Sequence, residues 1–339
     1  MKTYYLDQPG SLDNLAMRET PTPTPGAREV LMRVHATSLN YRDLGLALGT
    51  YKSPSMPLPL VPMSDGAGEI VAVGNGVTRV KVGDRVAGIF HQGWIGGPRR
   101  PEHPVGDLGG GIHGMLSEYV VLSEDGVVVI PEQLSFEEAA TLPCAAVTAW
   151  NTLQVQRPLQ AGETVLVQGS GGVSLFALQF AKLAGARVIA TSSSDERLER
   201  MRALGADELV NYTTHPAWED EVRALTGRRG VDLIVEVVGS MTQSLKCIRT
   251  GGRIGMVGQR GGQGVPASFG MIVGRHITVY GIGVGSRDDF EAMNRAIAMN
   301  NLKPVVDRVF AFEEAREAYR HLKDRAHFGK IVIAGPRGK

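Results

Sequence analysis

The chain has 339 residues, 43% of them hydrophobic and 21% charged, which is typical of a folded protein large enough for two domains. Its 36 Lys and Arg residues balance 35 Asp and Glu residues, and the net charge of +1 argues against general attraction to nucleic acid or to an anionic membrane. Two distant cysteines make no disulfide framework and no apolar run is long enough to span a bilayer, so we expect a cytoplasmic protein with small-molecule partners.

The first third of the chain alternates short β-rich runs with turn signals and contains few helical patterns. This spacing predicts a compact, largely antiparallel β unit. A long irregular stretch, residues 91–114, exceeds the usual length of a connection, and such loops are usually functional or mobile. The expected strands are residues 29–36, 68–74, 84–90 and 117–131.

From about residue 163 the pattern changes to strands that alternate with helices. Such alternation predicts βαβ units, a parallel sheet and right-handed crossovers, and six strands suffice for a doubly wound dinucleotide fold. The last segments, helices at 288–299 and 312–322 and a strand at 329–335, are expected to return to the first domain. The six expected strands are residues 164–169, 187–192, 208–212, 232–239, 253–258 and 277–284.

A glycine-rich turn joins the first of these strands to a helical run. Glycines permit a sharp turn and close approach of the backbone, and the helix N-terminus offers free N–H groups to a pyrophosphate. Ser174 stands at the third glycine position, but serine is small enough for close packing of helix and strand. The sequence therefore predicts that this turn binds a dinucleotide through Gly169, Gly171, Gly172 and Val173.

The end of the second strand indicates which dinucleotide is bound. An NAD enzyme usually has an acid there, whereas this chain has Ser192 and Ser193, with Arg197 one helical turn later. Hydroxyl donors and a guanidinium suit a 2′-phosphate, which a carboxylate would repel. Asp195 is an acid close to this position and by itself would favour NADH. However, Ser193 with Glu196 resembles a capping box, which would place Asp195 in the first helical turn. We expect NADPH, with NADH the less favoured alternative.

Six short motifs resemble those of the medium-chain dehydrogenase/reductase superfamily, and specifically its zinc-independent quinone oxidoreductase or zeta-crystallin-like branch. The resemblance implies an α/β fold with a GroES-like, β-rich catalytic domain and a doubly wound parallel-sheet (Rossmann) domain. It assigns residues 1–146 and 286–339 to the catalytic domain and residues 147–285 to the NADP-binding domain. The motifs are residues 40–43, 64–68, LPCAAVTAW, QGSGGVS, Asn211-Tyr212 and FGKIVI.

Zinc-dependent members of the superfamily hold a catalytic zinc at three positions, which the resemblance matches to Asn40, Ser64 and Cys144. Only the cysteine is a suitable ligand, so we expect no catalytic zinc. The loop at 91–114 lacks the four cysteines of a structural zinc lobe, and the spacing of its histidines matches no familiar ligand pattern. The superfamily's Ser–His proton relay is also missing, with Arg42 and Gly45 at its positions.

Two residues are candidates for catalysis. The resemblance gives Asn40 as an active-site asparagine that orients substrate or the nicotinamide ribose; the alternative is an amide that caps a turn. Tyr51 matches a pocket tyrosine that delivers a proton in related enoyl-thioester reductases, although Lys52-Ser53 before the proline disturbs that register; the alternative is an exposed loop aromatic. We expect Cys144 to be a thiol in a pocket wall rather than a nucleophile.

Further residues are candidates for binding the cofactor. The resemblance places Thr148 beside the nicotinamide, and Arg197 and Tyr212 around the 2′-phosphate. Three residues end successive strands of the nucleotide fold and so line its ligand crevice, unless they are only turn glycines and a buried strand residue. These three are Gly239, Gly258 and Ile282. Lys330 either reaches the cofactor or only begins a strand, and it stays unassigned.

Without zinc, the chemistry that remains is donation of hydride to an acceptor that is already electrophilic. We expect a zinc-independent, NADPH-dependent oxidoreductase that acts on a quinone, an enone or another activated alkene or carbonyl. The alternatives are an NAD(P)-dependent alcohol or ketone dehydrogenase and a non-catalytic, crystallin-like NADPH-binding protein. The strand at 277–284 is expected to form an exposed sheet edge that pairs with a second copy, which predicts a homodimer.

Overall fold

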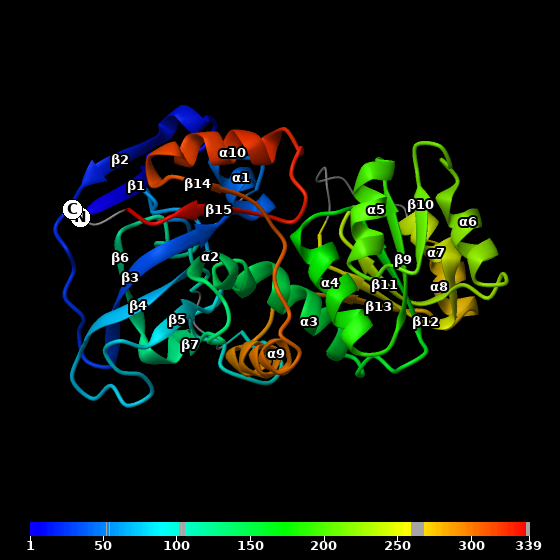
Figure 1. Ribbon diagram of the computed structural model, residues 1–339, viewed down its shortest axis with the longest axis horizontal. Coiled ribbons are helices and arrows are strands. Elements are labelled where there is room, and N and C mark those ends of the chain that lie inside the picture. Colours follow the sequence, from blue (N-terminus) through cyan, green and yellow to red (C-terminus); the bar gives the residue numbers. More distant parts are fainter. Residues whose placement is uncertain (52, 54, 102, 104–105, 259–267, 337–339) are drawn as a thin grey trace. The chain divides into compact units, whose positions relative to one another are not determined.

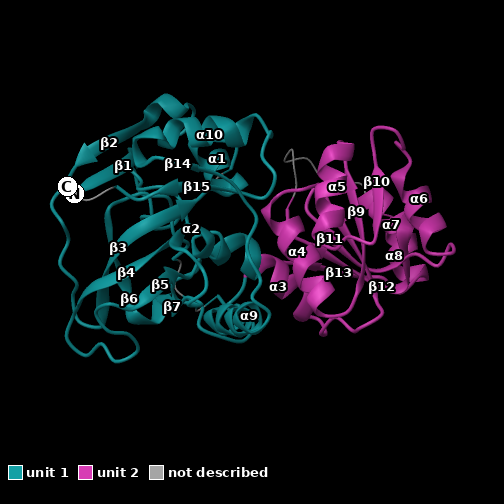
Figure 2. Ribbon diagram, viewed as in Figure 1, with its two compact units in different colours: residues 1–147, 285–339 teal, residues 148–284 magenta. Residues whose placement is uncertain are grey.

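The computed structural model describes residues 1–51, 53, 55–101, 103, 106–258 and 268–336 (Figure 1). The chain forms two compact units, which Figure 2 shows in separate colours. Unit 1 comprises residues 1–147 and 285–339, and unit 2 comprises residues 148–284. Among the described residues, no helix is long and apolar enough to cross a membrane.

A mainly antiparallel sheet forms the centre of unit 1. Its strand order is β14-β15-β3-β4-β5-β7, with β6 paired to β3, and only the β14–β15 pair is parallel. The C-terminal strand thus returns to the first domain, as its sequence predicted. A separate antiparallel pair joins β1 to β2. The strands are β1 (Lys2–Leu6), β2 (Leu15–Glu19), β3 (Glu29–Ser38), β4 (Asp65–Val73), β5 (Arg85–Gly88), β6 (Tyr119–Ser123), β7 (Val127–Val129), β14 (Val306–Phe310) and β15 (Lys330–Ala334).

The single strand expected at 117–131 is instead two strands, β6 and β7. A 3-10 turn, η2 (Glu124–Gly126), separates them, because Ser123 Oγ accepts the N–H of Asp125 at 3.2 Å and so caps this turn. The buried carboxylate of Glu124 also accepts the N–H groups of Thr78 and Arg79, at 2.7 and 2.8 Å. These local bonds take the place of the strand ladder at this point.

Helices cover the unit 1 sheet and form a core with it. Residues Leu44 of α1 and Tyr319 of α10 are buried in one apolar cluster with Ile331 of β15, so the helices near both ends of the chain share one core. A second cluster, which includes Met32 and Val86, lies among β3, β4 and β5. The helical segments are η1 (Leu12–Asn14), α1 (Tyr41–Ala47), α2 (Phe136–Ala139), the π-helical η3 (Leu142–Ala146), α9 (Arg287–Met299), η4 (Phe312–Glu314) and α10 (Ala315–Lys323).

Unit 2 is built on a parallel sheet with the strand order β10-β9-β8-β11-β12-β13. This is the doubly wound order, so the predicted fold class is confirmed. The strand expected at 277–284 is shorter than predicted, and the one expected at 253–258 begins earlier. The strands are β8 (Thr164–Gln168), β9 (Arg187–Ser192), β10 (Glu208–Asn211), β11 (Val231–Glu236), β12 (Ile248–Met256) and β13 (Thr278–Gly281).

Helices pack on both faces of this sheet. Trp218 of α6 and Leu245 of α7 are buried in one cluster with Ile234 of β11. Phe180 of α4 meets Trp150 of α3 edge-on, with 5.5 Å between the ring centres. Since both faces are covered, β8 and β11 are buried along their whole length, with apolar residues in the middle of each strand. The helices are α3 (Val147–Gln154), α4 (Gly172–Leu183), α5 (Asp195–Ala203), α6 (Trp218–Leu225), α7 (Met241–Cys247) and α8 (Phe269–Gly274).

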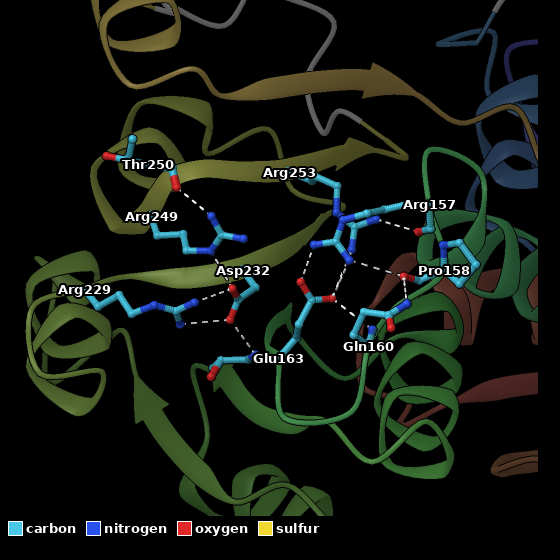
Figure 3. A network of polar contacts seen from close by, with 10 residues as sticks. Arg157, Pro158, Gln160, Glu163, Arg229, Asp232, Arg249, Thr250 and Arg253 are labelled. Carbon is cyan, nitrogen blue, oxygen red and sulfur yellow. Dashed lines mark hydrogen bonds and ion pairs between the residues drawn. The ribbon is translucent and has the colours of Figure 1, made fainter.

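A network of charged side chains joins the amino ends of β8 and β11 (Figure 3). Asp232 accepts hydrogen bonds from both terminal nitrogens of Arg229, at 3.0 and 2.7 Å, and from Nε of Arg249. It also accepts the backbone N–H of Thr164 at 2.8 Å, which ties β11 to the first residue of β8. Because dinucleotides bind at the carboxyl ends of such strands, we interpret this network as structural.

Candidate functional site

The glycine-rich turn of unit 2 leaves room for a ligand against its backbone. Gly169 has φ +73°, a conformation that side chains other than glycine rarely adopt, and Gly171 precedes the first residue of α4, Gly172. A Cβ atom on Gly169 or Gly171 would meet no atom within 4 Å. Val173 lies in the first turn of α4 and is half-buried. The turn is therefore open where a pyrophosphate would approach the helix N-terminus.

Ser174 shows how a serine can take the place of the third glycine. Its side chain is buried, and its Oγ donates to the backbone oxygen of Gln168 at 2.7 Å. The hydroxyl thus ties the first turn of α4 back to the end of β8. Close packing of helix and strand is kept despite the added side chain.

The end of β9 carries hydroxyl groups where NAD enzymes usually carry an acid. Ser192 is buried at the end of the strand, while Ser193 is exposed. The helix α5 is capped by Ser194, whose Oγ accepts the N–H of Arg197 at 3.4 Å. The capping box expected from Ser193 and Glu196 was therefore wrong: the N–H of Ser194 bonds Ser192 Oγ at 3.4 Å, and the helix begins at Asp195, one residue later than that box requires.

Two further residues lie near this serine-rich end of β9. Tyr212 follows β10, is exposed, and donates its backbone N–H to the oxygen of Ser192 at 3.0 Å. Arg197 lies in the first turns of α5 and is half-buried. Asp195 occupies the first helical turn, as expected, and its carboxylate accepts a hydrogen bond from Asn211 at 2.7 Å. The structure thus brings Ser192, Ser193, Arg197 and Tyr212 to one edge of the sheet.

The turn after β11 is organised by a buried carboxylate that our sequence interpretation missed. Glu236 Oε1 accepts the backbone N–H groups of Val238, Gly239 and Ser240, at 3.1, 2.8 and 3.2 Å. Its other oxygen accepts a hydrogen bond from Gln168 Nε2 at 3.1 Å, which links the turn to the end of β8. The signal in the sequence was an acid at the end of an otherwise apolar strand.

The remaining residues expected at the cofactor also lie in unit 2. Gly239 has φ +92° and so needs glycine. Gly258 follows β12, and Ile282 follows β13 with its N–H bonded to the oxygen of Met256 at 2.9 Å. Thr148 is buried in α3. Gly239, Gly258 and Ile282 therefore follow the carboxyl ends of three adjacent strands, where ligands of such sheets bind.

In unit 1, the three positions matched to zinc ligands lie close together. Asn40 Nδ2 donates to Ser64 Oγ at 3.3 Å, and Ser64 Oγ donates to Asp65 Oδ1 at 2.8 Å. The backbone N–H of Cys144 donates to Asp65 Oδ2 at 3.2 Å. Lys330, which the sequence left unassigned, joins them: its Nζ donates to Asn40 Oδ1 at 2.6 Å and lies 3.7 Å from Asp65 Oδ2.

The thiol of Cys144 is held in its neutral form. Cys144 is half-buried in the π-helical segment η3, a kind of distortion that is frequent at functional sites. Burial, together with the nearby Asp65 carboxyl group, raises the pKa of the Cys144 thiol far above its ordinary range. Since the thiolate is the form that attacks carbon, this environment does not suit a nucleophile.

These residues do not fit a catalytic zinc. An amide and a hydroxyl are poor zinc donors, and the Lys330 ammonium would repel a dication. Among the described residues, no three His, Cys, Asp or Glu side chains lie close enough to hold a metal ion. The histidines of the loop at 91–114 make separate contacts: His91 bonds Arg99, His103 the N–H of Arg100 and His113 the N–H of Val61.

Tyr51 is exposed and lies beside an arginine. The guanidinium of Arg42 lies 6.0 Å from the centre of the Tyr51 ring and 4.5 Å from that of Phe90, and it pairs with Asp107 at 2.7 Å. Gly45 makes room for this loop, because a Cβ there would lie 2.9 Å from Tyr51 Cβ. Lys52 and Pro54, on which the register of this motif depends, lie outside the described residues.

Asp43 has a structural position beneath Asn40. Its side chain is buried, and its Oδ2 accepts the backbone N–H of Asn40 at 2.7 Å, which fixes the start of α1. Burial raises the pKa of Asp43 to about 6, while the neighbouring Arg42 lowers it. The carboxyl group therefore serves to hold Asn40 in place.

Comparison with known proteins places this geometry among dehydrogenases. Residues 26–132 match the family described as alcohol dehydrogenase GroES-like domain, and residues 172–299 match the zinc-binding dehydrogenase family. A zinc-type alcohol dehydrogenase-like protein of Schizosaccharomyces pombe is 41% identical, over 96% of this chain and 97% of its own length.

Two other proteins indicate the range of activities. The NADPH-dependent alkenal/one oxidoreductase of Arabidopsis thaliana is 30% identical, over 98% of this chain and 79% of its own length. A crystal structure titled NAD-dependent alcohol dehydrogenase is 37% identical, with a TM-score of 0.89 over 98% of this chain and 99% of that one. The relatives therefore differ in both cofactor and substrate.

Proposed function

The chain belongs to the medium-chain dehydrogenase/reductase superfamily, and we propose that it is a zinc-independent, NADPH-dependent reductase of quinones, enones or other activated alkenes and carbonyls. One observation carries the proposal: an amide and a hydroxyl stand at two of the three positions matched to the zinc ligands, and a buried ammonium group lies beside them. Without a Lewis acid, an acceptor must already be electrophilic, as a conjugated carbonyl is.

Unit 2 is the proposed nucleotide-binding domain, and unit 1 the proposed catalytic domain. When bound, NADPH would supply the hydride. Hydroxyl groups and a guanidinium at the end of β9 support NADPH over NADH, because they suit a 2′-phosphate dianion. The residues proposed to hold the cofactor are Thr148, Gly169, Gly171, Gly172, Val173, Ser192, Ser193, Arg197, Tyr212, Gly239, Gly258 and Ile282.

Two side chains of unit 1 are proposed to act on the substrate. Hydride addition to an enone or quinone places negative charge on the carbonyl oxygen, and a hydrogen-bond donor aimed at that oxygen stabilises it. Asn40 would donate this bond. Tyr51 would then supply a proton, since a phenol can protonate an enolate.

The second candidate is an alcohol or ketone dehydrogenase, which the names of two of the similar proteins favour. A panel of acceptors separates the two functions. Consumption of NADPH and NADH should be measured with 1,4-benzoquinone, 2-cyclohexen-1-one, an enoyl thioester and a simple ketone, with oxidation of a secondary alcohol as the reverse test. We expect turnover of the quinone or an activated alkene with NADPH. Turnover of only the ketone and the alcohol would support the second candidate, and tight NADPH binding without any turnover would exclude both.

A homodimer is part of the proposal. Within the part of the chain that the structure describes, β13 pairs only with β12, so its other edge is free for a second copy. Val279 on this strand is exposed, as are Phe269 (81%) and Val273 (71%) of the preceding helix α8. Exposed apolar side chains beside a free strand edge support pairing of two copies there.

Replacing Val279 with aspartate should therefore convert the dimer to a monomer, because each interface would bury two carboxylates without partners. Light scattering on the purified protein measures the mass directly. Val309→Asp is the matched control, since Val309 is an equally apolar, exposed residue of β14 at the edge of the other sheet. A wild-type protein that is monomeric, or a Val279→Asp variant that stays dimeric, would contradict this interface.

A further inference from the structure

Lys330 is a buried cation bound directly to the asparagine proposed for catalysis. Its side chain is 4% exposed, and its Nζ donates to the backbone oxygen of Leu39 and to Asn40 Oδ1, both at 2.6 Å. The counterion is Asp65, whose nearer carboxylate oxygen lies 3.7 Å away and whose side chain is fully buried. A buried ammonium needs such partners, because an uncompensated charge in a protein interior is strongly unfavourable.

These contacts fix the direction of every hydrogen bond in the cluster. An ammonium group only donates, so the atom of Asn40 that faces Lys330 must be the amide oxygen. The amide nitrogen then points to Ser64 Oγ, 3.3 Å away. Ser64 in turn donates its proton to Asp65, so its oxygen is free to accept from Asn40. Lys330 therefore settles an orientation that an asparagine could otherwise reverse.

One N–H of Asn40 remains for a ligand. The two N–H bonds of an amide nitrogen diverge by about 120°. The hydrogen bond to Ser64 Oγ takes one of these directions, and Asn40 also helps to lower the pKa of Asp65, the carboxyl group to which Ser64 donates. Asn40 is partly exposed, unlike Ser64, Asp65 and Lys330, which are buried. The second N–H is thus the donor of this cluster that substrate can reach.

We propose that Lys330 is a positioning residue that orients the Asn40 amide, so that its second N–H donates to the carbonyl oxygen on which negative charge develops. The inference rests on the proposed reductase function and adds the residue that orients its hydrogen-bond donor. The ammonium also polarises the amide through its oxygen, which strengthens the N–H as a donor.

Asn40→Asp tests the donor with the smallest change of shape. An aspartate at position 40 still accepts from Lys330 and still suits the start of a helix, but it has no N–H to offer. We expect kcat to fall about 100-fold while the dissociation constant of NADPH, measured by fluorescence, is unchanged. Asn14→Asp is the matched control, since Asn14 is a half-buried asparagine of unit 1 whose Nδ2 donates to the oxygen of Gln8. An Asn40→Asp variant with wild-type kcat would overturn the proposal.

Variants of Lys330 test the positioning. Lys330→Met should lower kcat about 10-fold or more with little change in KM, and Lys330→Arg should restore part of the loss because it keeps a donor and a charge. In an Asn40→Ala background, Lys330→Met should cause almost no further loss, because the amide it orients is gone. If Lys330→Met instead lowers kcat by the same factor in the Asn40→Ala background as in the wild type, Lys330 does not act through Asn40, and the proposal is contradicted. If Lys330→Met does not fold, the kcat values of Lys330→Arg and Asn40→Asp still test the proposed role of Lys330.

A binding measurement separates failure of this inference from failure of the proposed function. The probes are p-nitrophenolate, which carries an oxyanion, and nitrobenzene, which does not. We expect the wild type with bound NADP⁺ to prefer the phenolate about 10-fold or more, and Asn40→Asp to lose that preference. This result would support the oxyanion site even if no acceptor on the panel were reduced. Equal affinity for the two probes in the wild type would overturn it even in an active reductase.

Discussion

Replacing Asp232 with alanine is expected to lower the free energy of unfolding by about 1–3 kcal/mol. The side chain is 2% exposed and binds two arginines, so its removal leaves two guanidinium groups without their counterion (Figure 3). It also leaves the backbone N–H of Thr164 without its acceptor at the start of the central strand β8. Urea denaturation of the whole protein, followed by the fluorescence of its tryptophans, measures this loss.

The loss should depend on pH in a defined direction. Burial alone would raise the pKa of Asp232, but hydrogen bonds from Arg229, Thr164 and Arg249 outweigh it and hold the pKa below its ordinary value of 3.8. A carboxyl group with a lowered pKa stabilises the folded state above its unfolded pKa, and this stabilisation is lost as the pH falls through the folded pKa. The difference between wild type and Asp232→Ala should therefore be constant near pH 7 and shrink below pH 3.8.

Glu208→Ala is the matched control, because Glu208 pairs with Arg187 in the same sheet but is about one-third exposed. Exposed pairs contribute only about 0–1 kcal/mol, so this variant should unfold close to the wild type. Equal losses from Asp232→Ala and Glu208→Ala would mean that burial of the carboxylate does not determine its contribution.

The cofactor preference is expected to reverse in the double variant Ser193→Asp, Arg197→Ala. Removing the guanidinium takes away a charge-assisted bond to the 2′-phosphate, of about 1.5–3 kcal/mol. The new carboxylate at the end of β9 repels that phosphate and accepts hydrogen bonds from a ribose that lacks it. Together the changes should lower the ratio of kcat/KM for NADPH to that for NADH by about 10²–10³.

The control for this change is Arg202→Ala, which removes the same charge from the same helix. Arg202 lies in the last turn of α5 and pairs with Glu199, away from the end of β9. It should leave the ratio unchanged. A double variant that keeps the wild-type ratio, or a wild type that already prefers NADH, would contradict the assignment of NADPH.

The fold of unit 2 could be predicted closely because its signals are local. Strand β9 has the expected bounds, Arg187–Ser192, because its central apolar residues lie in a parallel sheet that is buried on both faces. Strand β14 was missed because its short sequence, VDRVF, has two consecutive charged residues, which an edge strand tolerates. The β1–β2 pair was also missed, since it joins two short runs through a connection with no hairpin signal.

The candidate site divides in the same way. The residues of the glycine-rich turn follow one another in the sequence, and so do the serines at the end of β9. The position of each group could therefore be predicted from the ends of the neighbouring strand and helix. The bond between Lys330 and Asn40 joins residues 290 positions apart, and neither sequence motif specifies it. Glu236 was missed because an acid at a strand end shows its use only once the turn around it is folded.

Activity before and after removal of metal tests the central claim most directly. Zinc content and the rate of NADPH oxidation with 2-cyclohexen-1-one or 1,4-benzoquinone should be measured on one sample, then again after exhaustive treatment with a chelator. We predict less than one zinc per ten chains and an unchanged rate, because the residues around Asn40 offer no ligand set and carry a fixed ammonium group. Stoichiometric zinc whose removal abolishes the reaction, and whose return restores it, would contradict this account.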